Sequence, residues 1–223
     1  MAIGYDLPRY RCRRATSSIV IDGVVDEQDW ALADAIELGD VDGRVPHQKT
    51  TVKALYDDTT IYVAFECWDT EIWSTFSKRD AKVWQEEAVE LFISPPAVFP
   101  RQYFEFQLSP GNVLRDLIVT HDSEGGMSLD GDWDCAGIET CVCVRECEGY
   151  YVWSAEIGIP IKSLVPDVAS RSIAGQTWMA NFFRIDRRPR LEYSCWSPTF
   201  EPNFHVPEAF GRLVFSIKDQ EMS

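Results

Sequence analysis

The sequence lacks both a long apolar run and an excess of basic residues. No stretch is apolar enough and long enough to span a bilayer. Its 223 residues include 21 lysines and arginines against 36 aspartates and glutamates, for a formal net charge of −15. Because the acidic residues are spread along the whole chain, nucleic acid and anionic membrane surfaces would be repelled. We therefore expect no nucleic-acid and no membrane partner, and neutral or cationic ligands remain open.

Signals of export, of disulfides and of zinc binding are also missing. The first eight residues contain no basic segment followed by an apolar core, and no N-x-S/T sequon occurs. The seven cysteines include no paired C-x-x-C, and Cys141 and Cys143 lie in an alternating, strand-like run. These features predict reduced structural thiols and, for the chain in this form, a cytoplasmic location, with an extracellular one left open.

Catalytic motifs are few. The sequence contains no P-loop, no dinucleotide fingerprint and no G-x-S-x-G, and its three histidines are scattered. One enzymatic alternative is a glycoside hydrolase that uses Glu86 or Glu87 with Glu90, since glycoside cleavage needs two carboxylates. Neighbouring acids in a loop are usually just solvated, so we expect that the protein is not an enzyme.

Strand-like runs, by contrast, recur at short intervals and are separated by turn signals such as Pro110-Gly111-Asn112. This spacing predicts an all-β protein: an antiparallel β-sandwich of two packed sheets and about ten strands, in one domain over residues 1–223. Two short helices are expected, a capped one over 26–33 and another over 160–164. The expected strands cover residues 18–21, 51–56, 61–67, 88–94, 103–109, 113–120, 138–144, 150–157, 178–185 and 212–216.

Trp84 precedes a strand whose residues alternate clearly. Val89, Leu91 and Ile93 share one parity and Glu90 has the other, so Glu90 points away from the surface that the aliphatic side chains bury. A sugar offers a flat C–H face to an aromatic ring and a rim of hydroxyls to a carboxylate. Trp84 and Glu90 together are therefore typical of a sugar-binding site.

Alternation also orients two other strands. In residues 103–109 the apolar side chains share one parity and Glu105 and Gln107 the other, so one face is core and the other can meet ligand or water. In the strand near the C-terminus, Asn181 and Arg184 have opposite parity. These two side chains therefore face opposite ways and do not simply share a site.

The eight tryptophans are many for this length, and their neighbours separate them. Trp30 lies on a short helix face, and Trp153 and Trp178 lie in strands among apolar residues, so we expect these three in the core. Trp84 and Trp196 lie in loops beside polar residues of strands. For Trp84 and for Trp196, the sequence is equally consistent with contact to a ligand and with packing inside the protein.

Acidic turns raise the question of calcium. Residues 130–134 resemble the opening of an EF-hand loop, but Cys135 takes the place of the required glycine and Cys141 that of the bidentate glutamate. An acidic turn is therefore favoured there. A calcium site assembled from remote loops stays open, with the weak candidates Asp22, Asp26, Asp57 and Asp58.

Read in order, five segments resemble the family 9 carbohydrate-binding modules and their close relatives, including a subgroup of single-domain proteins. The resemblance extends over nearly the whole chain, and the order and spacing of the segments are more specific than any one of them. The matching segments are residues 21–30, 55–65, 84–94, 156–160 and 207–211.

The resemblance implies a β-sandwich that clamps a sugar ring between two aromatic side chains and carries structural calcium. Trp84 looks like the first aromatic plate, and Glu90, six positions on, like the acid that binds hydroxyls. Characterised members use an arginine where this chain has Glu105, which puts a copied sugar specificity in doubt. The resemblance leaves open which residue forms the second plate and which polar residues assist Glu90; the candidates are Trp196, Phe204 and His205, and Asn181 and Arg184.

Our leading hypothesis is therefore non-catalytic carbohydrate binding, with no cofactor required beyond possible calcium. Besides the glycoside hydrolase, an alternative is haem binding, since related sandwich domains hold haem through histidine or methionine. The axial ligands would then come from His121, His205 and Met127.

Overall fold

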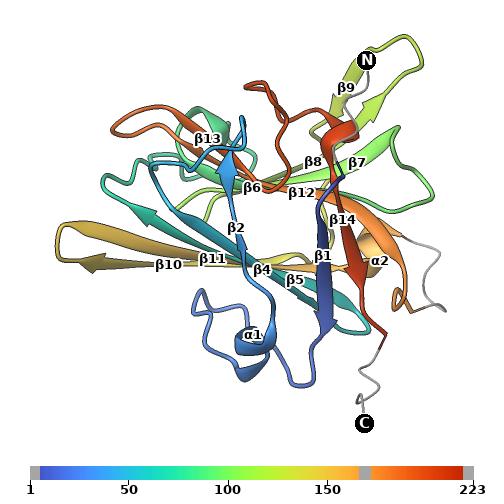
Figure 1. Ribbon diagram of the computed structural model, residues 1–223, viewed down its shortest axis with the longest axis horizontal. Coiled ribbons are helices and arrows are strands. Elements are labelled where there is room, and N and C mark those ends of the chain that lie inside the picture. Colours follow the sequence, from blue (N-terminus) through green and yellow to red (C-terminus); the bar gives the residue numbers. More distant parts are fainter. Residues whose placement is uncertain (1–5, 166–171, 218–223) are drawn as a thin grey trace.

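The computed structural model describes residues 6–165 and 172–217 (Figure 1). Within them the fold consists of fourteen strands, two short α-helices and two 3-10 helices, which confirms the all-β class. The helical elements are α1 (Gln28–Leu32), α2 (Ile161–Leu164), η1 (Val83–Gln85) and η3 (Pro207–Ala209). The strands are β1 (Arg9–Arg14), β2 (Ile36–Glu37), β3 (Gly39–Asp40), β4 (Thr50–Tyr56), β5 (Thr60–Asp69), β6 (Ala88–Ser94), β7 (Gln102–Leu108), β8 (Leu114–His121), β9 (Met127–Asp130), β10 (Glu139–Cys147), β11 (Tyr150–Pro160), β12 (Thr177–Asp186), β13 (Glu192–Cys195) and β14 (Gly211–Phe215).

The strands form one mixed sheet that curls over on itself. Its main path runs β10-β11-β5-β4-β1-β14-β12-β6-β7-β8-β9. β1 pairs in parallel with both β4 and β14 and so joins two otherwise antiparallel halves. The half that contains β5 and β11 faces the half that contains β6 and β12 (Figure 1). The predicted antiparallel sandwich of two separate sheets is therefore not confirmed, because a parallel strand makes the sheet continuous.

The sequence pattern does not predict β1, and its composition explains why. Four of its six residues are arginine, which gives the segment a solvated appearance. Tyr10 and Cys12 are nevertheless buried, and the arginines beside them project from the other face of the strand. The Tyr10 hydroxyl also donates to the carbonyl of Asp34 at 2.7 Å, which fixes the strand to the chain that follows α1.

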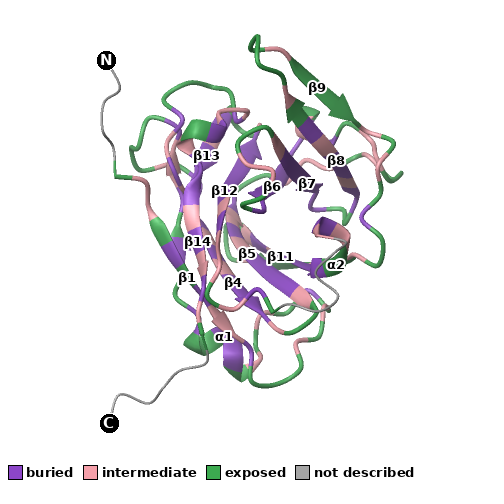
Figure 2. Ribbon diagram, turned by 90° about the vertical axis from the view of Figure 1, so that its right-hand side faces the viewer, coloured by how far each residue is buried: buried purple, intermediate pink, exposed green. Residues whose placement is uncertain are grey.

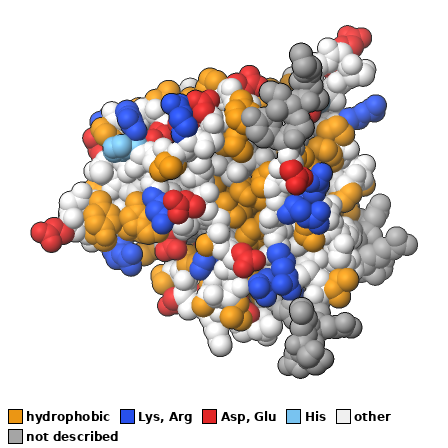
Figure 3. Space-filling model, viewed as in Figure 1, with side chains coloured by type: hydrophobic (Ala, Val, Ile, Leu, Met, Phe, Trp, Pro, Cys, Tyr) orange, Lys and Arg blue, Asp and Glu red, His pale blue; other side chains and the backbone are white. Residues whose placement is uncertain are grey.

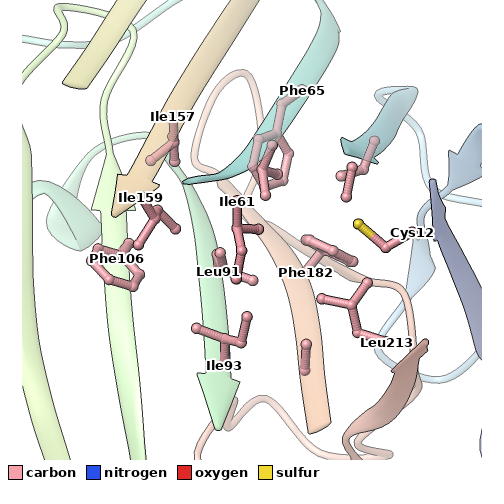
Figure 4. Close-up of a cluster of buried hydrophobic side chains, with 14 of the residues drawn as sticks. Cys12, Ile61, Phe65, Leu91, Ile93, Phe106, Ile157, Ile159, Phe182 and Leu213 are labelled. Atoms are coloured by element: carbon pink, nitrogen blue, oxygen red, sulfur yellow. The ribbon is translucent and has the colours of Figure 1, made fainter. Parts of the chain in front are cut away.

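The main hydrophobic core lies between the two halves of the sheet. Phe65 and Ile157 reach into it from one half, and Leu91 and Phe182 from the other (Figure 4). The aliphatic side chains of β6 belong to this core, as their parity predicts. Glu90 is consequently directed to the opposite face of the sheet.

A second apolar cluster lies on that opposite, outer face. Phe92, Tyr103, Phe183 and Phe210 are fully buried there although they point away from the main core. The chain after β13 covers them, and the strands beneath remain mostly buried in Figure 2. Other parts of the chain therefore cover much of the outer face of β6, β7 and β12, and its side chains are largely shielded from solvent.

The other predicted elements agree with the structure in part. Apart from residues 18–21, which are not a strand, every predicted strand is present with ends shifted by a few residues. Helix α1 is shorter than predicted and has no side-chain cap: its N-cap residue, Glu27, instead accepts a hydrogen bond from the backbone N–H of Val20. The expected core residues Trp30, Trp153 and Trp178 are confirmed as buried.

The surface of the described residues shows mixed charge. Acidic and basic side chains are interspersed over the face in Figure 3, with hydrophobic side chains between them. None of the helices in the described ranges combines the length and the apolar character needed to cross a membrane.

Candidate functional site

A pocket opens on the outer face of the half-sheet that contains β6, β7 and β8. Its volume is about 280 Å³. Pockets for drug-sized ligands span roughly 300–1,000 Å³, so this one suits a smaller ligand. It is lined by Trp84, Glu90, Phe92, Glu105, Gln107, Arg115, Leu117, Leu129, Ile185, Arg187, Tyr193, Pro202, Asn203, Phe204 and His205.

Three neighbouring strands form the floor of the pocket. Glu90 lies opposite Gln107, and Gln107 lies opposite Arg115 on the next strand. One row along, Phe92 lies opposite Glu105. Because side chains two apart in a strand share a face, both rows point into the pocket. The floor is therefore mostly polar, with charged groups of both signs on it.

Trp84 forms one wall, where η1 leads into β6. The Arg115 guanidinium lies over the Trp84 ring at 4.9 Å from the ring centroid and donates to the carbonyl of Asp80 at 2.9 Å. Arg187 donates through Nε and Nη2 to the Trp84 carbonyl at 3.2 and 2.8 Å. Two arginines thus hold the indole and its backbone at the rim, and Arg115 shares the wall with the ring.

The segment before η3 supplies an aromatic wall. Phe204 stacks on Phe183 with centroids 4.1 Å apart, and His205 stacks on Phe92 at 5.3 Å. The hydroxyl of Tyr103 lies 2.7 Å from Nδ1 of His205. Burial lowers the pKa of His205 to about 4, so the imidazole is neutral at neutral pH.

The floor contains polar atoms without partners. Glu90 Oε1, Glu105 Oε2, Gln107 Oε1 and Arg115 Nε are buried, and no protein group among the described residues hydrogen-bonds to them. Gln107 does donate through Nε2 to Glu105 Oε1 at 2.6 Å. Burial raises the pKa of Glu90, and the charge of Glu105 raises it further. Buried polar atoms nearly always have partners, so four orphans in one pocket indicate a ligand site.

Comparison with known proteins identifies the family. Residues 21–217 match the family model described as carbohydrate family 9 binding domain-like. The chain belongs to this family. A curated relative, an "extracellular protein" of Arthroderma benhamiae, is 28% identical over 193 residues, which cover 78% of this chain and 83% of the relative.

Solved structures are also similar in fold to the chain. A candidate carbohydrate-binding protein from Bacteroides uniformis superposes with a TM-score of 0.74 at 19% identity, covering 93% of this chain and 98% of its own. A family 9 module from Caldicellulosiruptor kristjanssonii superposes with a TM-score of 0.60 at 19% identity over 96% of this chain. That module was solved with cellotriose and with glucose, and 97% and 99% of its chain are covered. At these identities the likeness shows the fold.

Four of the seven predicted sugar contacts line this pocket. Trp84 and Glu90, from η1 and β6, meet Phe204 and His205 from the segment before η3. The structure brings these residues together across more than a hundred positions of sequence. Among the three candidates for the second plate, only Phe204 and His205 line the pocket.

Trp196 and Asn181 lie elsewhere. Trp196 packs against the main core, 5.6 Å from Phe182 and edge-on to Tyr10 at 6.5 Å. Asn181 is fully buried and bonds the backbone of Ser197, donating to its carbonyl at 2.8 Å and accepting from its N–H at 2.9 Å. Both side chains position the start of the segment that supplies the aromatic wall.

Arg184 is also outside the pocket, on the opposite face of β12. Its guanidinium is fully buried and bonds Asp69 at 2.6 Å and Asp186 at 3.2 Å. It also donates to the Trp68 carbonyl at 2.9 Å and lies 5.7 Å from the Trp153 ring centroid. Arg184 therefore joins the ends of β5 and β12 through Nη1 and Nη2, which both donate to protein groups.

The weak calcium candidates do not converge. Asp57 accepts from the backbone N–H groups of Thr59 and Thr60, and Asp58 pairs with Arg14. None of the four candidates belongs to a group of three acidic, histidine or cysteine ligand atoms within 4.8 Å in the described ranges. Asp22 also accepts a hydrogen bond from the backbone N–H of Val24, so three of the four carboxylates take part in turns or ion pairs. A calcium site at Asp22, Asp26, Asp57 and Asp58 stays a prediction.

Two other acidic groups do converge, and each contains an arginine. Asp69, Glu87 and Asp186 surround Arg184. Asp80, Asp116 and Asp134 surround Arg79, which lies 2.6 Å from Asp116. A guanidinium supplies the positive charge that such clusters would otherwise take from a metal ion.

The acids proposed for glycoside cleavage do not meet in the pocket that holds Glu90. Glu86 accepts hydrogen bonds from the backbone N–H of Thr75, at 2.6 Å, and from its hydroxyl. Glu87 accepts from the N–H of Trp73 at 3.0 Å. Neither residue lines the pocket that holds Glu90.

The haem candidates are only partly gathered. His121 and Met127 are cross-strand partners in the β8–β9 hairpin, and neither lines the pocket that holds His205. The Tyr103 ring lies 5.7 Å from the His121 ring and 6.3 Å from the His205 ring. No observation in the described residues favours haem.

Several residues that line the pocket are not among the sugar contacts predicted from the sequence. The parity of β7 predicts that Gln107 faces ligand or water, and it does. Arg187 belongs to the arginine-rich residues 184–190, which Asp186 and Pro189 interrupt, a pattern that predicts a solvated loop. Its guanidinium is instead bonded to the Trp84 carbonyl. Arg115 and Tyr193 reach the pocket from strands that no motif marks, so only the tertiary fold reveals them.

Proposed function

We propose that the protein is a non-catalytic carbohydrate-binding module that holds one sugar unit in this pocket. The family supports this, as do the structural neighbours that were solved with cellotriose and with glucose. The observation that carries the proposal is the group of four unpartnered polar atoms beside the Trp84 wall. Sugar hydroxyls donate and accept, so they match a floor of this kind.

Each wall has a role in this proposal. Trp84 and the aromatic wall contact the C–H faces of the ring, while Glu90 and Gln107 accept hydrogen bonds from hydroxyls and Arg115 donates one through Nε. Sugars are well solvated, so a few such contacts yield dissociation constants of roughly micromolar to millimolar.

Titration calorimetry against glucose, cellotriose and a panel of other mono- and oligosaccharides tests the proposal. Trp84→Ala should raise the dissociation constant at least about tenfold, equivalent to about 1.4 kcal/mol. Trp73→Ala is the matched control, because Trp73 also lies under an arginine, with Arg188 4.7 Å from its ring centroid, but is outside the pocket. That variant should bind as the unmodified protein does.

Two results would contradict the proposal. If no sugar produced heat, the proposed sugar-binding function would be wrong. If Trp84→Ala and Trp73→Ala weakened sugar binding equally, the assignment of the binding site to this pocket would be wrong. Release of chromophore from a panel of aryl glycosides would contradict the non-catalytic role.

A further inference from the structure

Glu90 and Glu105 form an unusual pair within the pocket. They are diagonal neighbours on β6 and β7, since Glu90 lies opposite Gln107 and Phe92 lies opposite Glu105. Each is only 2% exposed. Burial raises the pKa of both carboxyl groups, because an ion loses its hydration there.

Neither carboxylate forms an ion pair with a cationic side chain, although the charge of Arg115 on β8 opposes part of the rise in the pKa of Glu105. In the described part of the chain, no lysine or arginine nitrogen lies within 4.0 Å of either one. Arg115 donates to the Asp80 carbonyl, and Arg187 to the Trp84 carbonyl. His205 Nδ1 lies 3.9 Å from Glu105 Oε2, but this imidazole is neutral at neutral pH. Buried charges are normally paired, so this pair requires a cation or a proton.

The unpartnered atoms favour a donor-rich ligand. Glu90 Oε1, Glu105 Oε2 and Gln107 Oε1 are acceptors, and Arg115 Nε is the one donor among the four. Gln107 is 5% exposed and lines the same pocket, so the evidence for a bound ligand does not come from the two acidic residues alone. A primary ammonium offers three donors, no acceptor and a positive charge.

We propose that the pocket prefers a sugar that carries a primary ammonium group, such as a 2-amino-2-deoxyhexose, with the ammonium between Glu90 and Glu105. This inference rests on the proposed sugar-binding function and narrows its ligand class. A metal ion fits less well, because neither acid belongs to a group of three acidic, histidine or cysteine ligand atoms within 4.8 Å in the described ranges. The aromatic walls contact the ring of the amino sugar while its charge is neutralised at the floor.

Calorimetry at pH 7 with glucose, glucosamine and N-acetylglucosamine tests the preference. These sugars share the ring, and acetylation removes the positive charge. We expect glucosamine to bind at least about tenfold more tightly than either of the others. In Glu105→Gln the ratio of the glucose and glucosamine dissociation constants should fall toward one, because only Glu90 is left to pair with the ammonium. Circular dichroism establishes that the variant is folded.

A second measurement uses the unmodified protein and so does not depend on the variant. Binding an ammonium should ionise at least one carboxyl group of the pair and so release about one proton or more, whereas binding glucose should release none. Calorimetry in two buffers with different ionisation enthalpies measures that difference.

The outcomes separate the two proposals. If glucose binds as tightly as glucosamine, or no proton is released with glucosamine, the amino-sugar preference is overturned and the sugar-binding function stands. If no sugar binds, both are overturned.

Discussion

The six-membered ring of Trp196 lies in the space where a side chain on Gly211 would begin. A Cβ placed on Gly211 would be 2.5 Å from Cζ3 and 2.6 Å from Cη2 of the indole. Gly211 is in β14 and is not among the glycines with positive φ. Glycine is therefore required here by close approach to the ring rather than by backbone conformation.

Gly211→Ala should destabilise the protein by about 1–3 kcal/mol, because the methyl group must displace a ring that packs on Tyr10 and Phe182. Urea unfolding measures the loss. Sugar affinity of the folded variant should stay unchanged, since Trp196 does not line the pocket. A folded variant with weakened binding would instead place Trp196 in the sugar site.

Glu87→Gln should make the protein more stable above neutral pH. Burial and the charges of Asp69 and Asp186 raise the pKa of Glu87 to about 9. The folded state therefore keeps a proton that the unfolded state releases above about pH 4.5. The resulting stabilisation is complete below that pH and is lost as pH rises toward 9. A neutral glutamine removes this cost, so at pH 8 we expect a gain on the order of 2 kcal/mol.

Urea unfolding at pH 5 and pH 8 checks the change at Glu87. Glu86→Gln is the control, because both oxygens of Glu86 accept hydrogen bonds from Thr75 and its ionised form is already satisfied. That variant should show no gain at pH 8. A gain of equal size in both variants would mean that general charge reduction, rather than the buried cluster, is responsible.

Thiol reactivity should divide the seven cysteines into two classes. Three lie on β10, where they are exposed or half-buried, and four are buried. Burial also raises the pKa of the buried thiols, which lowers their thiolate fraction. With a chromogenic disulfide reagent we expect three equivalents to react in the native protein and all seven after unfolding in urea. Mass mapping should assign the fast class to Cys141, Cys143 and Cys147.

Chelation should leave the melting temperature unchanged. A guanidinium group, of Arg184 or Arg79, lies beside each of the two converging acidic groups and offsets part of its negative charge, so we expect neither group to need a metal ion. Differential scanning fluorimetry with excess EDTA, and then with excess calcium, checks this. A shift of several degrees in either direction would show that a bound ion contributes to stability.

Strand parity predicted the parts of the site that depend on local geometry. It placed Glu90, Glu105 and Gln107 on the face away from the core, and these three side chains form much of the pocket floor. It also separated Asn181 from Arg184 correctly, since they lie on opposite faces of β12. A period of two residues is enough for such statements because it is fixed by the covalent geometry of a strand.

The remaining parts depend on how distant segments meet. Trp196 and Phe204 are both aromatic residues in the same irregular segment, yet only Phe204 reaches the pocket. The direction of that segment is set partly by the hydrogen bonds of Asn181 to Ser197, which no local pattern reveals. Arg184 likewise looks available in the sequence, but Asp69, 115 positions earlier, holds it.

The parallel pairing of β1 with β14 determines how a pulling force would act on the domain. Arg9 lies beside Arg212 and Cys12 beside Phe215, so the two strands run side by side in the same direction. Tension applied before β1 and after β14 pulls the neighbouring strands lengthwise past each other. All the hydrogen bonds between them are then loaded together in shear, instead of opening one after another as in a peeled hairpin. Mechanical failure of the domain would therefore be abrupt, and it would begin at the junction that makes the sheet continuous.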